Sequence, residues 1–312
     1  MSPARCRADA SSSGADTVTV VGRGRVGTTI GKMCESLGVR HAFVTRGTAS
    51  FPPSSGPIYV ATHASDLDDV LALVPTDRAR DLVLLQGGLL RDDFLERRGL
   101  AGVATRVALY MSASGDGTAR DGGGGTCACG PRAADVRELL TRGGNVRCAV
   151  VNEDDFRVAS AGKSIWTSAF WLLCRSVAAE RGLPRALTVG EVVDSEHGAD
   201  AVRTLARELL DCAEAAGELR RTAGDDTAGD DGAAGDVTRE AIVRAMFEYS
   251  RSIPSSVPSL EMALKEGGFR NGWFLARRTV ESPQPTHEAH LRRIGVDPDV
   301  LAAMHLEQNA RE

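Results

Sequence analysis

The stretch Thr17–Ile30, TVTVVGRGRVGTTI, decides the predicted fold of this 312-residue chain. It begins with a run of Val and Thr, which is typical of a strand that is buried on both faces. Gly22, Gly24 and Gly27 follow with the spacing G-x-G-x-x-G, and a segment with helical character comes directly after them. This order predicts the strand, turn and helix of a dinucleotide-binding βαβ unit.

Each glycine of the turn has a separate physical role. Gly22 permits the tight turn, Gly24 lets the backbone approach a pyrophosphate, and Gly27 lets the helix pack closely on the strand. The amide groups at the helix N-terminus then bind the anion. The predicted cofactor loop comprises Gly22, Arg23, Gly24, Arg25, Val26 and Gly27. A glycine-rich turn without a ligand is the alternative interpretation.

The end of the second predicted strand indicates which cofactor is preferred. Sites that bind NAD usually carry an acidic residue there, which accepts a hydrogen bond from the ribose 2′-hydroxyl. This chain has Arg46 instead, and the neighbouring sequence contains no acid. A guanidinium suits a 2′-phosphate, so the sequence favours NADP over NAD. The alternative is that Arg46 is a solvated surface charge.

The first half of the chain alternates apolar strands with helices, which predicts an α/β fold with a doubly wound Rossmann sheet over residues 16–151. Helices are expected at Gly27–Leu37, Asp66–Leu73 and Ala133–Thr141. The glycine-rich stretch Ser114–Thr126 lacks the lysine of a Walker loop and is expected to be a long flexible hairpin loop. The strands are expected at Thr17–Val21, Ala42–Thr45, Ile58–Ala61, Leu82–Leu85, Val107–Tyr110, Thr126–Cys129 and Val146–Val151.

Residues 152–312 show a helical pattern, which predicts a mostly α-helical C-terminal domain. Within it the acidic stretch 222–236, TAGDDTAGDDGAAGD, has almost no apolar bulk and is predicted to be a disordered loop. Residues 1–15 are predicted to be a disordered tail, with the remnant of a transit peptide as the alternative. The expected helices are Phe156–Arg181, Gly198–Ala216, Val237–Ser252, Leu260–Glu266, Thr286–Ile294 and Asp297–Leu306.

Composition excludes several classes of protein. The net charge of -5 gives no support to a nucleic-acid partner, and no apolar run reaches the eighteen residues that a membrane span needs. The seven cysteines include only one close pair, Cys127 and Cys129, without a nearby histidine, so no metal site is predicted. Scattered cysteines in an odd number indicate reduced thiols and a cytoplasmic protein. A plastid or other organelle is the alternative if residues 1–15 are a transit-peptide remnant.

The order of motifs resembles that of the ketopantoate reductase family, whose helical domain is of the 6-phosphogluconate dehydrogenase type. The resemblance extends from Thr17 to about Phe274. After the cofactor loop, it is carried by the segments YVATHASDLDDVL (59–71), LLQGGLL (84–90), FRVASAGKSIWTSAF (156–170) and SIPSSVPSLEMALKEGGFRNG (252–272). It implies the Rossmann-plus-helical fold, NADP as cofactor and the reduction of a small carbonyl compound.

The resemblance implies roles for individual residues, but only in part. Lys163 corresponds to the catalytic lysine of the family, and Ser255 and Ser256 to its substrate-binding turn. Gln86 matches the glutamine of the family's LLQNG motif. Where the family has other residues, this chain carries His63 in place of a lysine, Gly87 and Thr167 in place of asparagines, and no clear counterpart of a late glutamate.

The residues around Lys163 independently predict a buried helix. Ser160, Lys163, Ser164, Thr167 and Ser168 recur at helical spacing as one polar stripe on an otherwise apolar helix. A lysine on such a helix needs a partner or a wet cleft, and a dry cleft would lower its pKa toward neutrality, as acid–base catalysis requires. The alternative is a lysine whose amine reaches the surface.

Two further residues are candidates because of where they fall. His63 follows the third predicted strand directly and is expected at the edge of the sheet where the cofactor binds, with a plain loop histidine as the alternative. Asn271 lies in the polar segment Arg270–Trp273 and is expected to bind substrate. The alternative there is an Asn-Gly turn with Trp273 as an apolar anchor.

The sequence therefore leaves two classes of function open. The first is an NADP-dependent oxidoreductase acting on a small carbonyl or hydroxy compound, with Lys163 as proton donor. The second is a non-catalytic NADP-binding sensor or assembly protein that retains the scaffold. The expected partners are a small-molecule substrate and a second copy of the chain in a homodimer.

Overall fold

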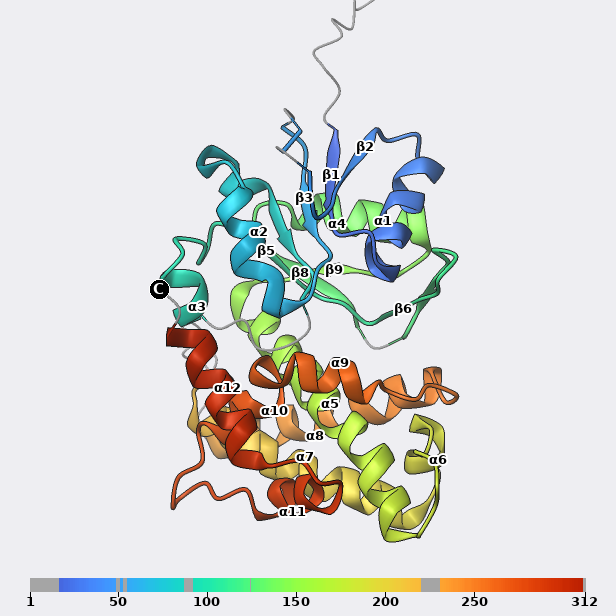
Figure 1. The fold of residues 1–312 in the computed structure, drawn as a ribbon, viewed down its shortest axis with the longest axis vertical. Helices are drawn as coiled ribbons and strands as arrows, with labels where there is room; N and C mark the ends of the chain where they lie inside the picture. The colour runs from blue at the N-terminus through green and yellow to red at the C-terminus, as the bar shows by residue number, and fades with distance from the viewer. Residues whose placement is uncertain are drawn as a thin grey trace, which may run out of the picture.

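The computed structural model describes residues 17–48, 51–52, 55–86, 92–123, 125–219 and 231–310. The predicted tail, most of the predicted acidic loop and Gly87 lie outside these ranges. An α/β region with a central sheet comes first in the chain and a helical region follows it, as predicted (Figure 1). Helix α5 (Glu153–Glu180) runs from the sheet into the helical region.

The main sheet has seven strands in the order β2-β1-β3-β4-β5-β8-β9. The first five are parallel, β8 is antiparallel to β5, and β9 is parallel to β8. All seven predicted strands are present within a few residues of the expected bounds. They are β1 (Val18–Val21), β2 (His41–Val44), β3 (Ile58–Val60), β4 (Leu82–Leu84), β5 (Thr105–Ala108), β8 (Cys127–Cys129) and β9 (Ala149–Val150).

Helices cover both faces of this sheet, because successive side chains of a strand point to opposite faces. Val20 and Tyr59 pack on the face covered by α1 (Arg25–Ser36) and α4 (Ala133–Glu138). Val21 and Val60 pack on the other face, against α2 (Leu67–Leu73) and α3 (Asp92–Glu96). This alternation is the doubly wound architecture that the apolar strands predicted. The short turns of this region are η1 (Ala64–Asp66), η2 (Thr76–Asp81) and the π-helical η3 (Leu139–Gly143).

The glycine-rich stretch 114–126 is more ordered than expected. Strands β6 (Met111–Ala113) and β7 (Ala119–Asp121) form an antiparallel hairpin, so only its tip and the segment that follows it lack strand structure. Asp116 accepts a hydrogen bond from the Thr118 amide and one from the Ser114 hydroxyl, and these bonds close the tip. The predicted hairpin is confirmed, and the two hydrogen bonds to Asp116 order its tip, where a flexible loop was expected.

The helical region packs around α5, whose apolar side chains form the centre of its core. Asn152 caps α5 by accepting a hydrogen bond from the Asp155 amide at 2.9 Å. Ser195 caps α7 by accepting a hydrogen bond from the Gly198 amide, while α6, with its capping box of Thr188 and Glu191, was not predicted. The other elements are α6 (Val189–Val193), α7 (Glu196–Ala215), α8 (Asp231–Ser252), α9 (Leu260–Lys265), η4 (Gly267–Phe269), α10 (Asn271–Leu275), α11 (Pro285–Arg293) and α12 (Pro298–Ala310).

Helix α8 begins at Asp231, six residues before the expected start at Val237. The end of the stretch predicted to be a disordered loop is therefore helical. Its small and acidic residues do not prevent a helix that continues into an amphipathic segment. Among the helices of the described ranges, none is long and apolar enough to cross a membrane.

Candidate functional site

Five parallel strands end at one edge of the sheet, and the predicted cofactor residues follow these ends. Ligands of doubly wound folds bind at this carboxyl edge, where the strand order reverses. In the order of the strands from β2 to β5, the residues beyond their ends are Arg46, the loop Gly22–Gly27, His63, Gln86 and Tyr110. The topology thus brings into one row residues that are separated by up to 88 positions in the sequence (110 − 22).

The glycine loop has the geometry that the fingerprint requires. Gly22 has φ +92°, and a β-carbon there would lie 3.0 Å from the carbonyl oxygen of Ala61. A β-carbon on Gly27 would lie 2.0 Å from the carbonyl oxygen of Gly22, so only glycine fits between helix and loop. Gly24 differs, because no atom lies within 4 Å of the position of a β-carbon there. A glycine is therefore required at this position only if a ligand fills the open space in front of the backbone.

The start of α1 offers donors to an anion. Gly24 is the N-cap residue, no side chain accepts a hydrogen bond there, and the first turn holds no acid. Arg25 begins the helix and is exposed, and Arg23 lies with its guanidinium 5.0 Å from the ring centre of Phe43. Backbone amides, the helix dipole and two arginines therefore give this end of the loop a positive character.

Arg46 lies beyond β2 with 92% of its side chain exposed, and its nearest acid comes from a different strand end. The Nη2 atom of Arg46 is 3.9 Å from Oδ2 of Asp66 in η1, and Lys265 approaches the same carboxylate oxygen at 3.8 Å. The sequence neighbourhood of Arg46 contains no acid, but the fold places one beside it. A carboxylate at this place can accept from a ribose 2′-hydroxyl, so the lack of a neighbouring acid in the sequence does not by itself favour NADP.

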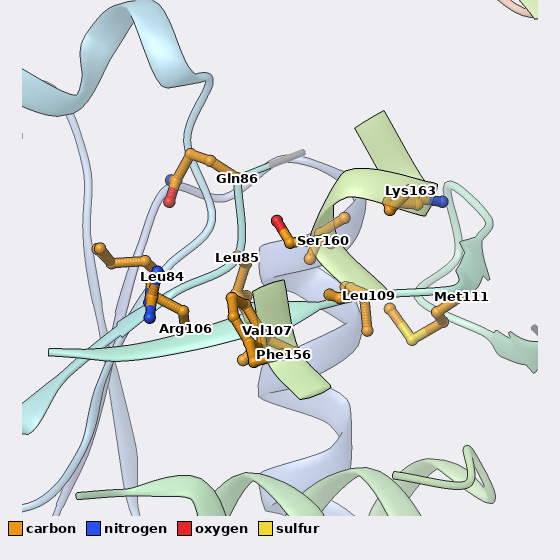
Figure 2. Close-up of a pocket in the computed structure, with 12 residues that line it drawn as sticks. Leu84, Leu85, Gln86, Arg106, Val107, Leu109, Met111, Phe156, Ser160 and Lys163 are labelled. Carbon is orange, nitrogen blue, oxygen red and sulfur yellow. The ribbon is translucent and has the colours of Figure 1, made fainter. Parts of the chain in front are cut away.

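A pocket of about 160 Å³ lies between the ends of β4 and β5 and the first turns of α5. Its volume is well below the roughly 300–1,000 Å³ of a pocket that holds a whole ligand, so it encloses only a small group. Figure 2 shows the side chains around it. They are Val26, Leu84, Leu85, Gln86, Arg106, Val107, Ala108, Leu109, Met111, Phe156, Ser160 and Lys163.

Gln86 is the buried polar residue on the sheet side of the pocket. Its Nε2 atom donates to the carbonyl oxygens of Val60 and Thr62 at 3.1 and 3.2 Å, which fixes the orientation of the amide. Its Oε1 atom is buried and has no hydrogen-bond partner among the described residues. Since a buried acceptor without a donor costs free energy, this atom is available to a donor group of a ligand.

Lys163 lies on the helix side of the pocket. It shares a partly exposed stripe of α5 with Ser160 and Thr167, whereas Ser164 and Ser168 of the predicted stripe are buried. Ser160 and Lys163 line the pocket, and Thr167 lies one turn further along α5. In Figure 2 the amine of Lys163 points away from Gln86.

The amine of Lys163 is enclosed by aromatic rings. Its Nζ atom lies 4.3 Å from the ring centre of Tyr110, 4.4 Å from that of Tyr249 and 5.0 Å from that of Trp166. Burial lowers the pKa of Lys163 to about 7, and the positive charge of Arg270 contributes in the same direction. The alternative of a surface-seeking lysine does not describe this environment, although the residue as a whole is partly exposed.

The residue that the sequence analysis missed is Glu266, between α9 and η4. Its carboxylate is buried, lies 3.4 Å from Nδ1 of His63 and pairs with the guanidinium of Arg270. It joins the strand end of β3 to the helical region through His63 and the backbone amide of Ala64. In the sequence, Glu266 stands directly before the Gly-Gly-Phe segment. This position alone does not distinguish a buried acid from a solvated one.

Asn271 was expected to bind substrate, and the structure gives it another role. Its side chain is fully buried and accepts from Nε1 of Trp171 at 2.7 Å. Its amide nitrogen donates to the Ser168 carbonyl at 3.1 Å and lies 2.7 Å from Nε2 of His287. Both polar atoms are thus used inside the protein, and α10 starts where an Asn-Gly turn was the alternative. Trp273, by contrast, is the buried anchor that this alternative included.

Ser255 and Ser256 lie in the turn between α8 and α9. Ser255 is exposed, and the carbonyl oxygen of Ser256 accepts from the amide of Val189 at the start of α6. Neither residue is among those that line the pocket. Within the described ranges, no group of three or more His, Cys, Asp or Glu side chains could hold a metal ion.

No protein-family model matches the chain, and a search of curated proteins finds no significant relative by sequence. Solved structures do match. A ternary structure of D-mandelate dehydrogenase with NADH and anilino(oxo)acetate has 13% sequence identity and a TM-score of 0.62, covering 92% of this chain and 99% of the other. The 2-dehydropantoate 2-reductase from Methylococcus capsulatus has 14% identity and a TM-score of 0.60, covering 95% and 98%.

A third match, the probable 2-dehydropantoate 2-reductase of Bacillus subtilis, has 13% identity and a TM-score of 0.51, covering 95% of this chain and all of the other. Identities at this level establish likeness of fold alone. At that level the expected resemblance to ketopantoate reductases is confirmed. The chain has a Rossmann-plus-helical fold that is shared by NAD(P)-dependent dehydrogenases and reductases.

Proposed function

We propose that this protein is an NADP(H)-dependent oxidoreductase that acts on a small carbonyl compound or on the corresponding alcohol. The observation that carries the proposal is the convergence of three features at one edge of the sheet. The open glycine loop, the unsatisfied Oε1 of Gln86 and the desolvated Lys163 belong to a single site. The likeness in fold to D-mandelate dehydrogenase, which was solved with NADH, supports a nicotinamide cofactor.

The described residues fit such a cofactor. The open space before Gly24 and the uncapped start of α1 suit a pyrophosphate, because backbone amides there can approach its oxygens. Gln86 would accept a hydrogen bond from the cofactor or substrate through Oε1. His63, beside Glu266 at the next strand end, is a further proposed cofactor contact.

NADP is the form of the cofactor that we propose, on the strength of Arg46. Its exposed guanidinium, beyond the strand that borders the glycine loop, can pair with a 2′-phosphate. Asp66 beside it offers an acceptor for a ribose hydroxyl and thus argues for NAD. Two pairs of titrations, with NADPH and NADH on wild type and Arg46→Ala, discriminate between these possibilities.

Lys163 is the residue that we propose as proton donor. When bound, the nicotinamide supplies or accepts the hydride, so the protein must orient the substrate and manage the proton. A lysine with a pKa of about 7 exists in both protonation states near neutral pH, which suits transfer of a proton to a developing alkoxide. Thr167, one turn further along α5, and the turn at Ser255 and Ser256 remain proposed substrate contacts.

One observation favours the second candidate function, a non-catalytic NADP-binding protein. The amine of Lys163 points away from Gln86 and rests on aromatic rings, so it is not directed at the buried acceptor of the pocket in this conformation. A sensor or assembly protein could keep such a lysine for stability alone.

The decisive experiment follows NADPH absorbance during incubation with a panel of 2-keto acids and aldehydes. We expect one class to be reduced, and Lys163→Met to lower turnover by roughly 10²–10⁴ while NADPH affinity is unchanged. Lys32→Met, which makes the same change at an exposed lysine outside the pocket lining, is the matched control. Tight NADPH binding with no turnover on any member would instead support the non-catalytic alternative, and failure to bind NADPH would end both.

A further inference from the structure

Three aromatic rings from three different parts of the chain surround the amine of Lys163. Tyr110 follows β5 in the sheet region, Trp166 lies on α5, and Tyr249 lies near the end of α8. We call these three residues the aromatic cage. Their ring centres lie 4.3, 5.0 and 4.4 Å from Nζ, within the distance at which a ring face attracts an ammonium group.

The rings of the cage support one another. Tyr249 meets Tyr110 edge to face, with centroids 4.9 Å apart, and meets Trp166 with centroids 4.7 Å apart. The Nε1 atom of Trp166 donates to the Ser250 hydroxyl at 2.9 Å, which orients the indole. Packing and hydrogen bonds hold the cage in place, so it does not depend on the lysine for its shape.

The backbone leaves little room for rearrangement around Tyr249. A β-carbon on Gly122, after β7, would lie 2.3 Å from a ring carbon of Tyr249, so only glycine allows this ring its position. The hydroxyl of Ser252 donates to the Gly122 carbonyl and joins the same segment to α8. The hairpin and α8 are therefore fitted together where the cage forms.

Among the described residues, no charged group near the amine stabilises its ammonium form in place of the aromatic rings. Within the described ranges no carboxylate forms an ion pair with Lys163, and Glu266 pairs with Arg270 and His63. The charge of Arg270 disfavours an ammonium at Lys163, and Arg106, on the pocket lining, pairs with Glu153. The hydroxyls of Tyr110 and Tyr249 stay neutral, because burial raises the pKa of both. The ring faces are thus the favourable environment that the ammonium has in this site.

We propose that Tyr110, Trp166 and Tyr249 are positioning residues, which hold the amine of Lys163 as an ammonium beside the pocket until the side chain rotates toward a ligand. Burial alone would drive the amine to its neutral form, and a neutral amine could not donate a proton. The quadrupoles of the rings oppose this effect, since they attract a cation and not a neutral amine. Burial and the charge of Arg270 both lower the pKa of Lys163, and the ring faces act against this lowering.

The chain suits a direct test, because it contains only three lysines, Lys32, Lys163 and Lys265. Protein labelled with ¹³C at the lysine side chains gives three sets of ε-carbon resonances, and Lys163→Met assigns one of them. We expect a pH titration to give the wild-type Lys163 a pKa near 7, with Lys32 and Lys265 as internal references. The measurement uses the full chain without cofactor or substrate.

The variants distinguish the effect of the Tyr249 ring face on the pKa of Lys163 from the effects of the Tyr249 hydroxyl and of core packing. Tyr249→Leu should lower the pKa of Lys163 by about one pH unit, because the ammonium loses one ring. Tyr249→Phe should keep the wild-type value, since it retains the ring. Phe170→Leu, which removes a ring stacked on Trp166 at 5.1 Å, is a matched core control that should leave the value unchanged.

An unchanged or raised pKa in Tyr249→Leu, or an equal fall in Tyr249→Phe, would overturn the proposal. Melting curves check that each variant is folded, and Trp166→Phe and Trp166→Leu give a second pair if Tyr249→Leu is not. The catalytic meaning of the cage rests on the proposed function. If a substrate is found, the pH dependence of kcat should shift with the Lys163 pKa in Tyr249→Leu at unchanged KM for NADPH. If no substrate is found, the resonance titration still tests whether the aromatic cage stabilises the ammonium form of Lys163.

Discussion

The glycine loop and the core around Asn271 are both marked by a short glycine-containing motif, yet they obey different rules. In the loop the requirement is local: a positive φ at Gly22 and a contact between Gly27 and the Gly22 carbonyl. At Asn271 the requirement is distant, because its partners Trp171 and His287 come from α5 and α11. Spacing along the chain therefore identifies the first motif and misidentifies the second.

The sharpest way to test the loop is to substitute its glycines separately. Gly27→Val should disrupt the loop and lower stability strongly, because its β-carbon would overlap the Gly22 carbonyl oxygen at 2.0 Å. Gly24→Val should fold normally and lose at least about 100-fold in NADPH affinity, because the side chain occupies the space of the pyrophosphate. Melting curves and cofactor titrations measure the two effects. Normal NADPH affinity in a folded Gly24→Val protein would contradict the proposed cofactor site.

A substitution in the hydrogen-bond network of Asn271 should lower the stability of the protein without changing its cofactor specificity. Asn271→Ala leaves the buried groups of Trp171 and His287 without a partner, so we expect a loss of about 3 kcal/mol in the free energy of unfolding. The matched control is Asn152→Ala, an exposed asparagine whose loss as a helix cap should cost about 1 kcal/mol. Urea unfolding compares the two, and equal effects would show that the network contributes no more than a surface cap.

Lys163 lies on the same helix as Trp171 and lines the same pocket as Val26, and its burial should be visible in the pH dependence of stability. The folded pKa of about 7 lies below the ordinary lysine value of 10.5, so the unfolded chain binds the proton more tightly between these values. The loss of folding free energy caused by burying the ammonium is therefore complete below pH 7. It disappears as the pH approaches the pKa of the lysine in the unfolded state. Lys163→Met should be more stable than wild type by roughly 2 kcal/mol at pH 6–7, and the difference should shrink toward pH 10. A constant difference across urea titrations at pH 6, 8 and 10 would contradict the desolvated amine.

The smallest expected effect concerns the exposed end of the cofactor site. Arg46→Ala should weaken NADPH binding by about tenfold and leave NADH binding unchanged, since only the former carries a 2′-phosphate. Asp66→Asn is the companion variant, because it removes the carboxylate 3.9 Å from Arg46 and should strengthen NADPH binding slightly. Equal losses for both cofactors in Arg46→Ala would show that Arg46 does not read the phosphate.

The sequence alone determined the order of strands and helices, the glycine loop and the position of Lys163 on a buried helix. These features depend on spacing and apolar periodicity, which are properties of neighbouring residues. The sequence also predicted a hairpin at β6 and β7, but the hydrogen bonds that order its tip and the early start of α8 escaped prediction, because side-chain turns and helix propagation carry little apolar signal.

Only the tertiary structure decided what the polar side chains do. The fold placed Asp66 beside Arg46, Glu266 between His63 and Arg270, and three aromatic rings around Lys163. It also turned Asn271 from a candidate substrate contact into a core residue. The physical reason is that the partners of a buried polar group are set by which elements pack together, and these elements are distant in the sequence.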